Sequence, residues 1–267
     1  MRIKEIQAKS IIIKSNLPEG DFVINPYVGC QHSCIYCYAR FMKRFTGHEE
    51  PWGEFIDVKI NAPNLIKNIS KFRNKSITIG SVTDAYQPIE LKYKLTKRIL
   101  EKLVNLQPKL DIITKSDLVL RDIGILKKFD NCIIAFSFSS LDDGLRKQLE
   151  PLACSTERKI NALRILKSAG IKTAVFISPI IPKITDWKKI IELTKDFTDE
   201  YWFENLNLYP SIKESMFRFY KKNGIEFSER DHSLAYWVSV EKEIREYCKN
   251  LDFTIYFHHT NIKRNKA

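Results

Sequence analysis

The sequence predicts an α/β fold in which a parallel sheet is covered by helices. Short runs of β-branched and apolar residues alternate with amphipathic helical segments from about residue 76 to residue 208. These runs are almost continuously apolar, which is typical of strands buried on both faces of a parallel sheet. About six β/α units are visible, so an open six-unit barrel and a doubly wound sheet both fit, whereas a closed barrel requires about eight.

The elements follow from local patterns. The expected strands cover residues 10–14, 21–25, 55–59, 77–82, 110–114, 132–138, 173–178 and 201–208. The expected helices cover residues 64–72, 95–106, 119–129, 160–169, 187–193 and 233–249. Pro63 fits the first turn of a helix, and Gly170 is a typical helix stop. Since ligands of such folds bind at the carboxyl ends of strands, the polar residues that follow each strand are the ones to inspect.

The chain changes character at about Pro210. The segment beyond it is rich in charged and aromatic residues, with a helix at 233–249 and a short strand at 253–257. We therefore expect a core over residues 1–210, which contains a cysteine loop at 26–40. A small α/β C-terminal extension over residues 211–267 is expected to pack on this core.

Composition limits the function classes. The chain has 267 residues and a formal net charge of +12, which favours anionic partners such as nucleic acid. The lysines are spread along the chain, so a lysine-rich composition without functional meaning explains the charge equally well. We find no signal peptide and no apolar run of about 20 residues that would span a membrane. A cytoplasmic protein with reduced cysteines is expected, which favours a metal or redox role over disulfides.

Three of the six cysteines lie in one loop. Cys30, Cys34 and Cys37 have the spacing C-x3-C-x2-C, and three thiolates this close in sequence can bind one soft metal centre. A structural zinc normally takes four protein ligands, and His32 in the first gap is a possible fourth. From the residues alone, a zinc-stabilised binding module and a non-catalytic iron–sulfur protein for binding or electron transfer both remain open.

The other metal-ligating residues are weaker candidates. Cys132 opens a core strand, where a buried cysteine acts as a small hydrophobic residue. Cys154 follows a strand and is the extra cysteine placed to face the site, although an ordinary loop residue fits as well. His258 and His259 are adjacent in the expected tail strand, so they point to opposite faces and are expected to be structural.

The cysteine loop, with its aromatic residue before the last cysteine, is similar to the signature of the radical S-adenosylmethionine (radical SAM) superfamily. Four further stretches resemble the spore photoproduct lyase-like branch, namely residues 80–90, 114–122, 137–142 and 149–152. The resemblance extends from about residue 20 to residue 210. It implies an open partial (β/α)6 TIM-like barrel, which agrees with one of the two folds that the alternation of strands and helices leaves open.

The resemblance also implies an activity and its cofactors. In that superfamily three cysteines, here Cys30, Cys34 and Cys37, bind a 4Fe–4S cluster, and its open iron binds S-adenosylmethionine. Reductive cleavage then gives a 5′-deoxyadenosyl radical, which abstracts hydrogen from a substrate, while the protein orients and shields the radical. An external reductant of the flavodoxin or ferredoxin type is implied. The substrate stays open, and the net charge favours DNA or RNA.

Roles for single residues are implied by position. The residues implied to contact S-adenosylmethionine are Tyr36 near the adenine, Gly80, Ser81 and Asp84 near the amino group, Lys115 and Arg158 near the carboxylate, and Ser137 near the ribose. Two of these have plain structural alternatives, because Asp84 also fits a turn cap and Arg158 a solvated or paired arginine. Tyr38 matches a tyrosine near the route of hydrogen transfer in the lyase.

One residue departs from the lyase pattern. The lyase has a cysteine after its second strand that donates hydrogen to the product radical, and the matching stretch here contains Ser81 and no thiol. A serine O–H bond is too strong to serve as that donor. The lyase reaction itself is therefore not expected, unless Cys154 or a tyrosine such as Tyr38 replaces the donor.

Overall fold

The computed structural model describes residues 1–15, 17, 20–67 and 72–258. Its strands are β1 Arg2–Ile6, β2 Ile12–Lys14, β3 Phe22–Ile24, β4 Tyr27–Val28, β5 Phe55–Lys59, β6 Ser76–Ile79, β7 Lys109–Thr114, β8 Cys132–Phe138, β9 Lys172–Ile180, β10 Glu200–Asn205 and β11 Phe253–Ile255. Its α-helices are α1 Glu90–Tyr93, α2 Leu95–Leu103, α3 Ile123–Leu126, α4 Asp143–Leu149, α5 Thr156–Ser168, α6 Trp187–Thr194, α7 Pro210–Lys222 and α8 Leu234–Tyr247. Its 3-10 helices are η1 Tyr38–Phe45, η2 Ala62–Leu65, η4 Val104–Leu106, η5 Asp117–Asp122, η6 Lys195–Phe197 and η7 Glu229–His232.

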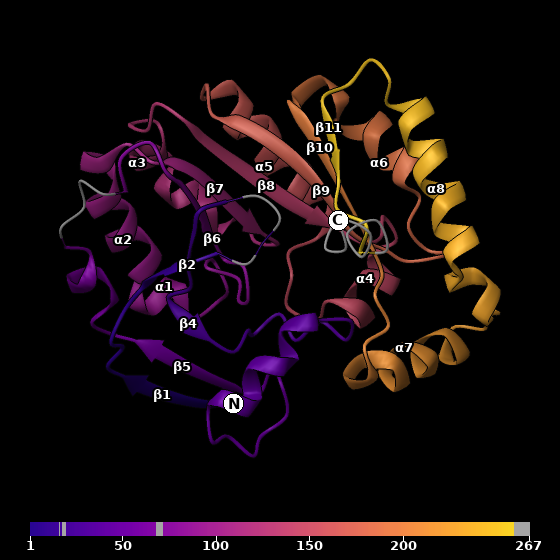
Figure 1. The fold of residues 1–267 in the computed structure, drawn as a ribbon, viewed down its shortest axis with the longest axis horizontal. Coiled ribbons are helices and arrows are strands. Elements are labelled where there is room, and N and C mark those ends of the chain that lie inside the picture. Colours follow the sequence, from indigo (N-terminus) through magenta and orange to yellow (C-terminus); the bar gives the residue numbers. More distant parts are fainter. Residues whose placement is uncertain (16, 18–19, 68–71, 259–267) are drawn as a thin grey trace, which may run out of the picture.

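The main sheet is an open partial barrel (Figure 1). Among the described residues it has eight strands in the order β11-β10-β9-β8-β7-β6-β3-β2. All neighbouring pairs in this order are parallel except the last one, in which β2 runs antiparallel to β3. The sheet starts at β11 and ends at β2 without pairing between them, so the barrel does not close. The predicted open (β/α) barrel is confirmed.

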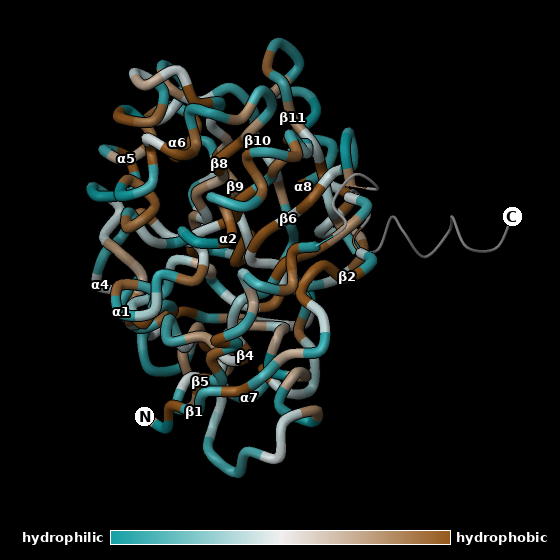
Figure 2. The backbone as a smooth tube through the Cα atoms, turned by 90° about the vertical axis from the view of Figure 1, so that its left-hand side faces the viewer, coloured by the Kyte–Doolittle hydropathy of each residue, from teal (hydrophilic) through white to brown (hydrophobic). Residues whose placement is uncertain are grey.

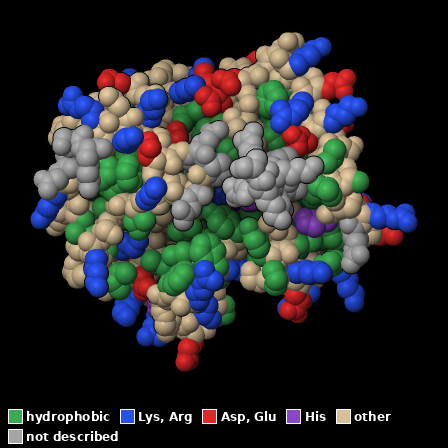
Figure 3. Space-filling model, viewed as in Figure 1, with side chains coloured by type: hydrophobic (Ala, Val, Ile, Leu, Met, Phe, Trp, Pro, Cys, Tyr) green, Lys and Arg blue, Asp and Glu red, His purple; other side chains and the backbone are tan. Residues whose placement is uncertain are grey.

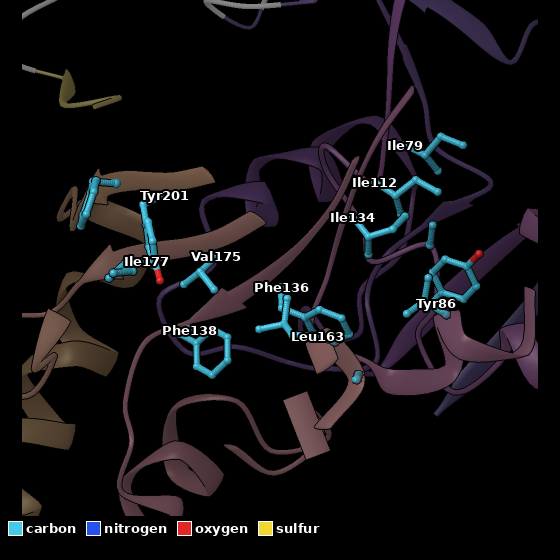
Figure 4. Close-up of a cluster of buried hydrophobic side chains, with 14 of the residues drawn as sticks. Ile79, Tyr86, Ile112, Ile134, Phe136, Phe138, Leu163, Val175, Ile177 and Tyr201 are labelled. Carbon is cyan, nitrogen blue, oxygen red and sulfur yellow. The ribbon is translucent and has the colours of Figure 1, made fainter. Parts of the chain in front are cut away.

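Helices cover the outer face of this sheet (Figure 1). The helices α4, α5, α6 and α8 start at a side-chain cap; the Ser155 hydroxyl, for example, accepts a hydrogen bond from the Arg158 backbone N–H at the start of α5. The predicted stop at Gly170 has φ +78°, a conformation that glycine adopts without strain. Buried side chains from strands and helices form one continuous core on this face, including Ile112, Phe136 and Leu163 (Figure 4).

The inner face of the sheet carries a separate apolar layer. Side chains alternate between the two faces of a strand, so this layer takes alternate residues from the strands β7 to β10. Its members are Ile113, Ile133, Ala135, Ala174, Phe176 and Trp202, together with Tyr256 just after β11. In Figure 2 the chain is most hydrophobic along these central strands, and hydrophilic segments lie mainly at the periphery. The residues that follow this layer at the carboxyl ends of the strands are therefore placed over the inner face.

A small second sheet holds the cysteine loop from below (Figure 1). Its order is β1-β5-β4, with β1 parallel to β5 and β4 antiparallel to it. Tyr27, Ile56 and Val58 pack there with Leu95 in a core of their own. Strand β4 leads directly into the cysteine loop, so this sheet fixes where that loop begins.

The expected C-terminal extension contributes to the main sheet. Strand β11 pairs in parallel with β10, and Trp237 of α8 packs against Phe257 just beyond β11. The predicted helix over residues 64–72 appears as the short η2 with Pro63 in its first turn, and residues 68–71 lie outside the described residues. Residues 259–267, including His259, also lie outside them. Among the described helices, none is both long and apolar enough for a membrane span.

Candidate functional site

Close packing shapes the cysteine loop. Gly29 has φ +89°, and a Cβ built there would lie 2.3 Å from the Phe55 backbone oxygen. Gly53 has φ +95°, and a Cβ there would lie 2.2 Å from the Ser33 hydroxyl oxygen. Both contacts are far shorter than any van der Waals separation, and both backbone conformations disfavour side chains. Glycine at these two positions therefore lets β5 and the loop approach each other.

Hydrogen bonds tie the loop to the segment after β6 and to the end of α4. The Thr83 hydroxyl donates to the Gly29 carbonyl at 2.5 Å, and the Gln31 backbone N–H donates to Gln87 Oε1 at 2.8 Å. The Ile35 backbone N–H donates to the Leu149 carbonyl at 3.0 Å. The loop is therefore held in place by protein contacts alone, as a preformed metal site requires.

All three loop cysteines carry free thiols. Cys30 and Cys34 are 8% and 7% exposed, and Cys37 is half-buried. Burial raises the pKa of the Cys30 thiol to about 12. Burial also raises the pKa of Cys34, although the nearby Lys115 charge acts in the opposite direction. The thiols are therefore protonated in the free chain, and binding of a metal centre releases those protons.

Beside these thiols lie two buried N–H groups that have no hydrogen-bond partner among the described residues, Arg40 Nε and Trp52 Nε1. Burial raises the pKa of Cys37, while the Ala39 backbone N–H, the Lys115 and Arg40 charges and the Trp52 indole lower it. Donors aimed at cysteine sulfur are the environment that iron–sulfur clusters use to set their reduction potential. The residues present therefore fit a cluster.

The same geometry does not favour zinc. No three His, Cys, Asp or Glu side chains in the described part of the chain converge closely enough to share one metal ion. A 4Fe–4S cluster makes no such demand, because each of three irons takes one thiolate. His32, the possible fourth zinc ligand, places its Nε2 3.0 Å from Asp84 Oδ2, and among the described residues it forms no metal-binding group with the three cysteines. The iron–sulfur interpretation is the one that the loop supports.

Lys115 stands at the end of β7 beside the cysteine loop. Its Nζ donates to the Ser137 hydroxyl at 2.8 Å and lies 5.9 Å from the centre of the Tyr36 ring. Burial lowers the pKa of Lys115, but the charges of Glu150, Cys34 and Asp84 outweigh this effect and raise it to about 12. The structure therefore brings three predicted site residues together around one permanent positive charge, and such a cation binds a carboxylate strongly in a dry site.

Glu150 is the main member of the site that sequence reasoning missed. Its Oε1 accepts hydrogen bonds from the Tyr36 hydroxyl and from the Ser139 hydroxyl, and its Oε2 pairs with Lys159 Nζ at 3.1 Å. Burial raises its pKa, but Lys159 and Lys115 lower it to about 2. Glu150 thus fixes the aromatic ring of the cysteine loop. The only signal in the sequence was its place in the motif at 149–152.

Asp84 is a fully bonded hub. Its Oδ1 accepts from the Tyr86 backbone N–H and the Thr114 hydroxyl, and its Oδ2 accepts from Lys115 N and pairs with His32. Burial works in the opposite direction, yet His32 and these hydrogen bonds hold the pKa of Asp84 below its ordinary value. The carboxylate therefore joins the cysteine loop to the ends of β6 and β7, so its predicted contact with a ligand would compete with four existing partners.

Gly80, Ser81 and Tyr38 form the next part of the site. Gly80 has φ +93° at the end of β6, which lets the chain turn towards the cysteine loop. The Ser81 hydroxyl accepts from Asn25 Nδ2 at 2.9 Å, and the Ser81 carbonyl accepts from the Tyr38 hydroxyl. Burial of its hydroxyl raises the pKa of Tyr38, and the Glu204 charge adds to this effect. The structure therefore places Tyr38 between Ser81 and the end of β10.

Arg158 and Cys154 form a separate group. Arg158 Nε and Nη2 donate to both carboxylate oxygens of Asp117 at 2.7 and 2.5 Å, and the arginine side chain is 63% exposed. Burial raises the pKa of the Cys154 thiol to about 11, and its backbone N–H donates to the Lys115 carbonyl. Among the described residues, no hydrogen bond links either side chain to the Lys115–Ser137 pair.

Comparison with known proteins agrees with this site. The family model of the radical SAM superfamily matches residues 24–194. An uncharacterised protein of Methanocaldococcus jannaschii is 45% identical over 211 residues, which cover 79% of this chain and 80% of that protein. A radical SAM Nalpha-GlyT isomerase of Pseudomonas phage M6 is 27% identical over 162 residues, which cover 60% of this chain and 33% of the phage protein.

Solved structures show the same fold. Spore photoproduct lyase complexed with dinucleoside spore photoproduct superposes with a TM-score of 0.73 at 16% identity, over 96% of this chain and 82% of that one. The family match covers more than half of the chain and includes the cysteine loop and the strands around it. The chain therefore belongs to the radical SAM superfamily, and it is an enzyme that uses a 4Fe–4S cluster and S-adenosylmethionine.

Proposed function

We propose that this radical SAM enzyme abstracts hydrogen from a nucleic-acid substrate. The observation that carries the proposal is an exposed aromatic and basic surface that begins at the cysteine loop. It consists of Phe41, Arg44 and Phe45 on η1 and of Lys213 and Phe217 on α7, and we call it the rim surface. Stacking platforms combined with positive charge are how proteins bind single-stranded nucleic acid.

The η1 part of the rim surface lies on a helix that starts one residue after Cys37. Phe41 and Phe45 are 41% and 66% exposed, although aromatic side chains of this size are normally largely buried. The Arg44 guanidinium carbon lies 5.5 Å from the centre of the Phe41 ring and 4.7 Å from that of Phe45. Figure 3 shows hydrophobic side chains with Lys or Arg beside them below the centre of this face.

Helix α7 extends this surface and is bonded to the cysteine loop. Arg40 Nη1 donates to the Ser211 carbonyl at 3.3 Å, and the Ser215 hydroxyl donates to the Ile35 carbonyl at 2.9 Å. Lys213 Nζ lies 5.7 Å from the centre of the half-exposed Phe217 ring. A strand that stacks on the rim surface would thus pass directly beside the cluster-binding thiols.

Charge and relatives support the same substrate class. The formal net charge of +12 favours a polyanion. The lyase of similar fold was solved with a dinucleoside. These similarities extend to the fold and the superfamily, so the nucleic-acid substrate of this chain rests on its own rim surface.

The residues of the site have distinct tasks in this proposal. When bound, the cluster and S-adenosylmethionine supply a 5′-deoxyadenosyl radical after one electron arrives from an external reductant of the flavodoxin or ferredoxin type. Lys115 would hold the carboxylate of S-adenosylmethionine, and Ser137 would hold its ribose. Tyr36, whose hydroxyl is bonded to Glu150, would lie beside the adenine, and the turn at Gly80 and Ser81 would hold the amino group. Tyr38 stands towards the substrate.

The first experiment measures cofactor chemistry and substrate binding together. The chain is reconstituted with iron and sulfide without oxygen, and 5′-deoxyadenosine is quantified after addition of dithionite and S-adenosylmethionine. Fluorescence anisotropy then measures binding of labelled single-stranded DNA and RNA over a salt series. We expect tight binding at low salt that weakens steeply as salt rises. No binding at low salt would overturn the nucleic-acid assignment.

Substitutions test the rim surface itself. The double variant R44A/F45A should weaken oligonucleotide binding by about tenfold, because it removes one cation and one stacking platform. Arg98, an exposed arginine on α2 of the outer helical layer, provides a charge-matched control. R98A should bind within about twofold of the unaltered chain. Equal losses in both variants would show that net charge acts without a docking surface.

A further inference from the structure

A row of polar residues lies over the inner apolar layer at the carboxyl ends of the strands. Each member stands two positions beyond a residue of that layer in the sequence. The row is Lys115 after Ile113, Ser137 after Ala135, Ser178 after Phe176, Glu204 after Trp202 and His258 after Tyr256. Because side chains two apart in a strand share one face, Ser137, Ser178 and Glu204 continue the inner face beyond the apolar layer. Lys115 and His258 lie just beyond the ends of β7 and β11 and join this row through hydrogen bonds.

Hydrogen bonds connect this row from one end to the other. Lys115 Nζ donates to the Ser137 hydroxyl at 2.8 Å, which in turn donates to the Ser178 carbonyl at 3.0 Å. The Ser178 hydroxyl donates to Glu204 Oε2 at 2.5 Å, and His258 Nε2 lies 3.2 Å from Glu204 Oε1. Lys115 and Ser137 serve the cofactor in the proposed function. Glu204 and His258, at the far end, have no role in it.

The side chains of Glu204 and His258 are partly exposed and have few protein partners. Their side chains are 23% and 43% exposed, whereas those of the internal pair Glu150 and Lys159 are 0% and 1% exposed. In the described part of this basic chain, Glu204 has no Lys or Arg partner, and its one ionic partner is His258. A carboxylate offers about four acceptor positions. Two of those of Glu204 are used by Ser178 and His258, so it retains capacity to bind a ligand.

The pair is also connected to the cofactor end of the site. Glu204 Oε2 accepts from the Ser178 hydroxyl, and the Ser137 hydroxyl joins the Ser178 carbonyl to Lys115 Nζ. Lys115 Nζ in turn lies 5.9 Å from the centre of the Tyr36 ring in the cysteine loop. The position of His258 is fixed by a further hydrogen bond, because its backbone N–H donates to Asn205 Oδ1 at 3.1 Å. A carboxylate and an imidazole are thus held side by side at the far end of the row that begins beside the cysteine loop.

We propose that Glu204 and His258 bind the base of the substrate nucleotide. Glu204 accepts a hydrogen bond from an N–H group of the base, and His258 as an imidazolium, with its Nε2–H on Glu204, donates one from Nδ1 to the neighbouring carbonyl or ring nitrogen. Carboxylates accept from exocyclic base amines, and an adjacent donor and acceptor mark the pairing edge of every nucleobase. This inference rests on the proposed nucleic-acid substrate. It adds that Glu204 on β10 and His258 after β11 recognise the base, while the rim surface binds the rest of the single-stranded nucleic acid.

Base preference of the reconstituted holoenzyme tests the pair. Fluorescence anisotropy measures the dissociation constants of labelled single-stranded homopolymers of deoxyadenylate, deoxycytidylate and deoxythymidylate of equal length. The ratio of the weakest to the tightest dissociation constant expresses the base preference. We expect E204Q and H258Q to reduce this ratio by about fivefold or more, because each removes one base contact. Both variants should retain cluster absorbance, since the cofactor end of the row is intact.

Glu200 provides the matched control. It lies on the same strand and the same face as Glu204, at the opposite end of β10, where it accepts from Trp202 Nε1 at 3.0 Å and pairs with Lys172. E200Q should keep the base preference of the unaltered chain. An unchanged ratio in E204Q, or binding without any base preference in the unaltered chain, would overturn the inference and leave the proposed function standing. If no homopolymer binds at low salt, the proposed function fails and the inference with it.

Discussion

The two ends of the polar row differ in how completely the protein occupies them. Around β6, β7 and β8, Asp84 has four protein partners, and Glu150 is 0% exposed and bonded to Tyr36, Ser139 and Lys159. Around β9, β10 and β11, Glu204 and His258 are partly exposed and hold each other with few other contacts. In the first region, the protein itself supplies the hydrogen-bond partners of the buried carboxylates. In the second region, Glu204 retains acceptor positions that a ligand can use.

This difference matches two tasks. A cofactor that makes a radical must be oriented closely and kept from water, which favours a rigid and internally bonded binding site. A substrate that arrives and leaves in each cycle needs groups that exchange protein or water partners for its own. The comparison therefore supports the proposal that the β6–β8 end binds S-adenosylmethionine and the β9–β11 end binds the substrate. Four substitutions break or sharpen it.

The largest effect is expected from Cys34→Ala. Removing one of three thiolates should abolish stable cluster binding and lower 5′-deoxyadenosine formation by more than about a hundredfold, because the electron passes through the cluster. Iron and sulfide analysis with visible absorbance checks the first claim, and chromatography checks the second. Cys132→Ala alters a buried cysteine on β8 outside the loop and should retain the cluster. Equal cluster content in both variants would show that Cys34 is not a cluster ligand and would contradict the assignment of the β6–β8 end to the cofactor.

Glu150→Gln tests the rigidity of the β6–β8 end. It leaves Lys159 buried without its partner and should lower the free energy of unfolding at pH 7 by about 3 kcal/mol. Since the folded pKa of Glu150 is held at about 2, its stabilisation is present above the ordinary pKa and disappears as pH falls through about 2. The difference between the two chains should therefore be smaller at pH 3 than at pH 7.

Urea titration of the cluster-free chain at both pH values measures this. Glu243→Gln breaks a pair with Lys188 whose side chains are 52% and 44% exposed, and it should cost less than about 1 kcal/mol. A difference for Glu150→Gln that is as small as this, or one that grows as pH falls, contradicts the role of Glu150 as a buried, ionised anchor.

Lys115→Met tests the shared boundary of the two regions. Loss of the charged donor should weaken S-adenosylmethionine binding by about tenfold to fiftyfold, as expected for one charge-assisted hydrogen bond. Equilibrium dialysis with the reconstituted chain measures the dissociation constant. Lys109→Met alters the exposed lysine at the other end of β7 and should bind normally. If Lys115→Met retains the cluster and binds S-adenosylmethionine with unchanged affinity, Lys115 does not contact the cofactor, and the proposed position of the cofactor beside this row is wrong.

The smallest effect concerns Tyr38, which stands between the regions. In deuterated water without substrate, exchangeable protein hydrogens within reach of the radical place deuterium in 5′-deoxyadenosine. Tyr38→Phe should lower that deuterium content by about threefold, because its hydroxyl is bonded to the Ser81 carbonyl at the proposed cofactor site. Mass spectrometry measures the label. Cys154→Ser should change it less, since Cys154 lies near the Asp117–Arg158 pair, which has no hydrogen bond to Lys115 or Ser137 among the described residues. The reverse order would identify Cys154 as the donor.

Much of the fold was predictable because its signals are local. Alternating apolar runs and amphipathic helices predict the parallel sheet, and the spacing of Cys30, Cys34 and Cys37 predicts the metal centre. The strand-end rule led to Lys115 and Ser137, which the structure joins by a hydrogen bond. The sequence did not predict the Glu150–Lys159 pair, because this pairing depends on where α5 packs against the sheet. His258 was expected to be structural, and its contact with Glu204 became visible only when β11 joined β10.

The sequence by itself determined the chemistry that is available: three thiolates in one loop, an aromatic residue between them and a cation after a buried strand. These depend on residue type and short spacing, which folding does not change. Only the tertiary structure decided which groups are occupied and which are free. Asp84 became a bonded hub, Arg158 was paired by Asp117, and Glu204 retained acceptor capacity. Occupancy depends on partners from distant segments, and the order of strands in the sheet determines those partners.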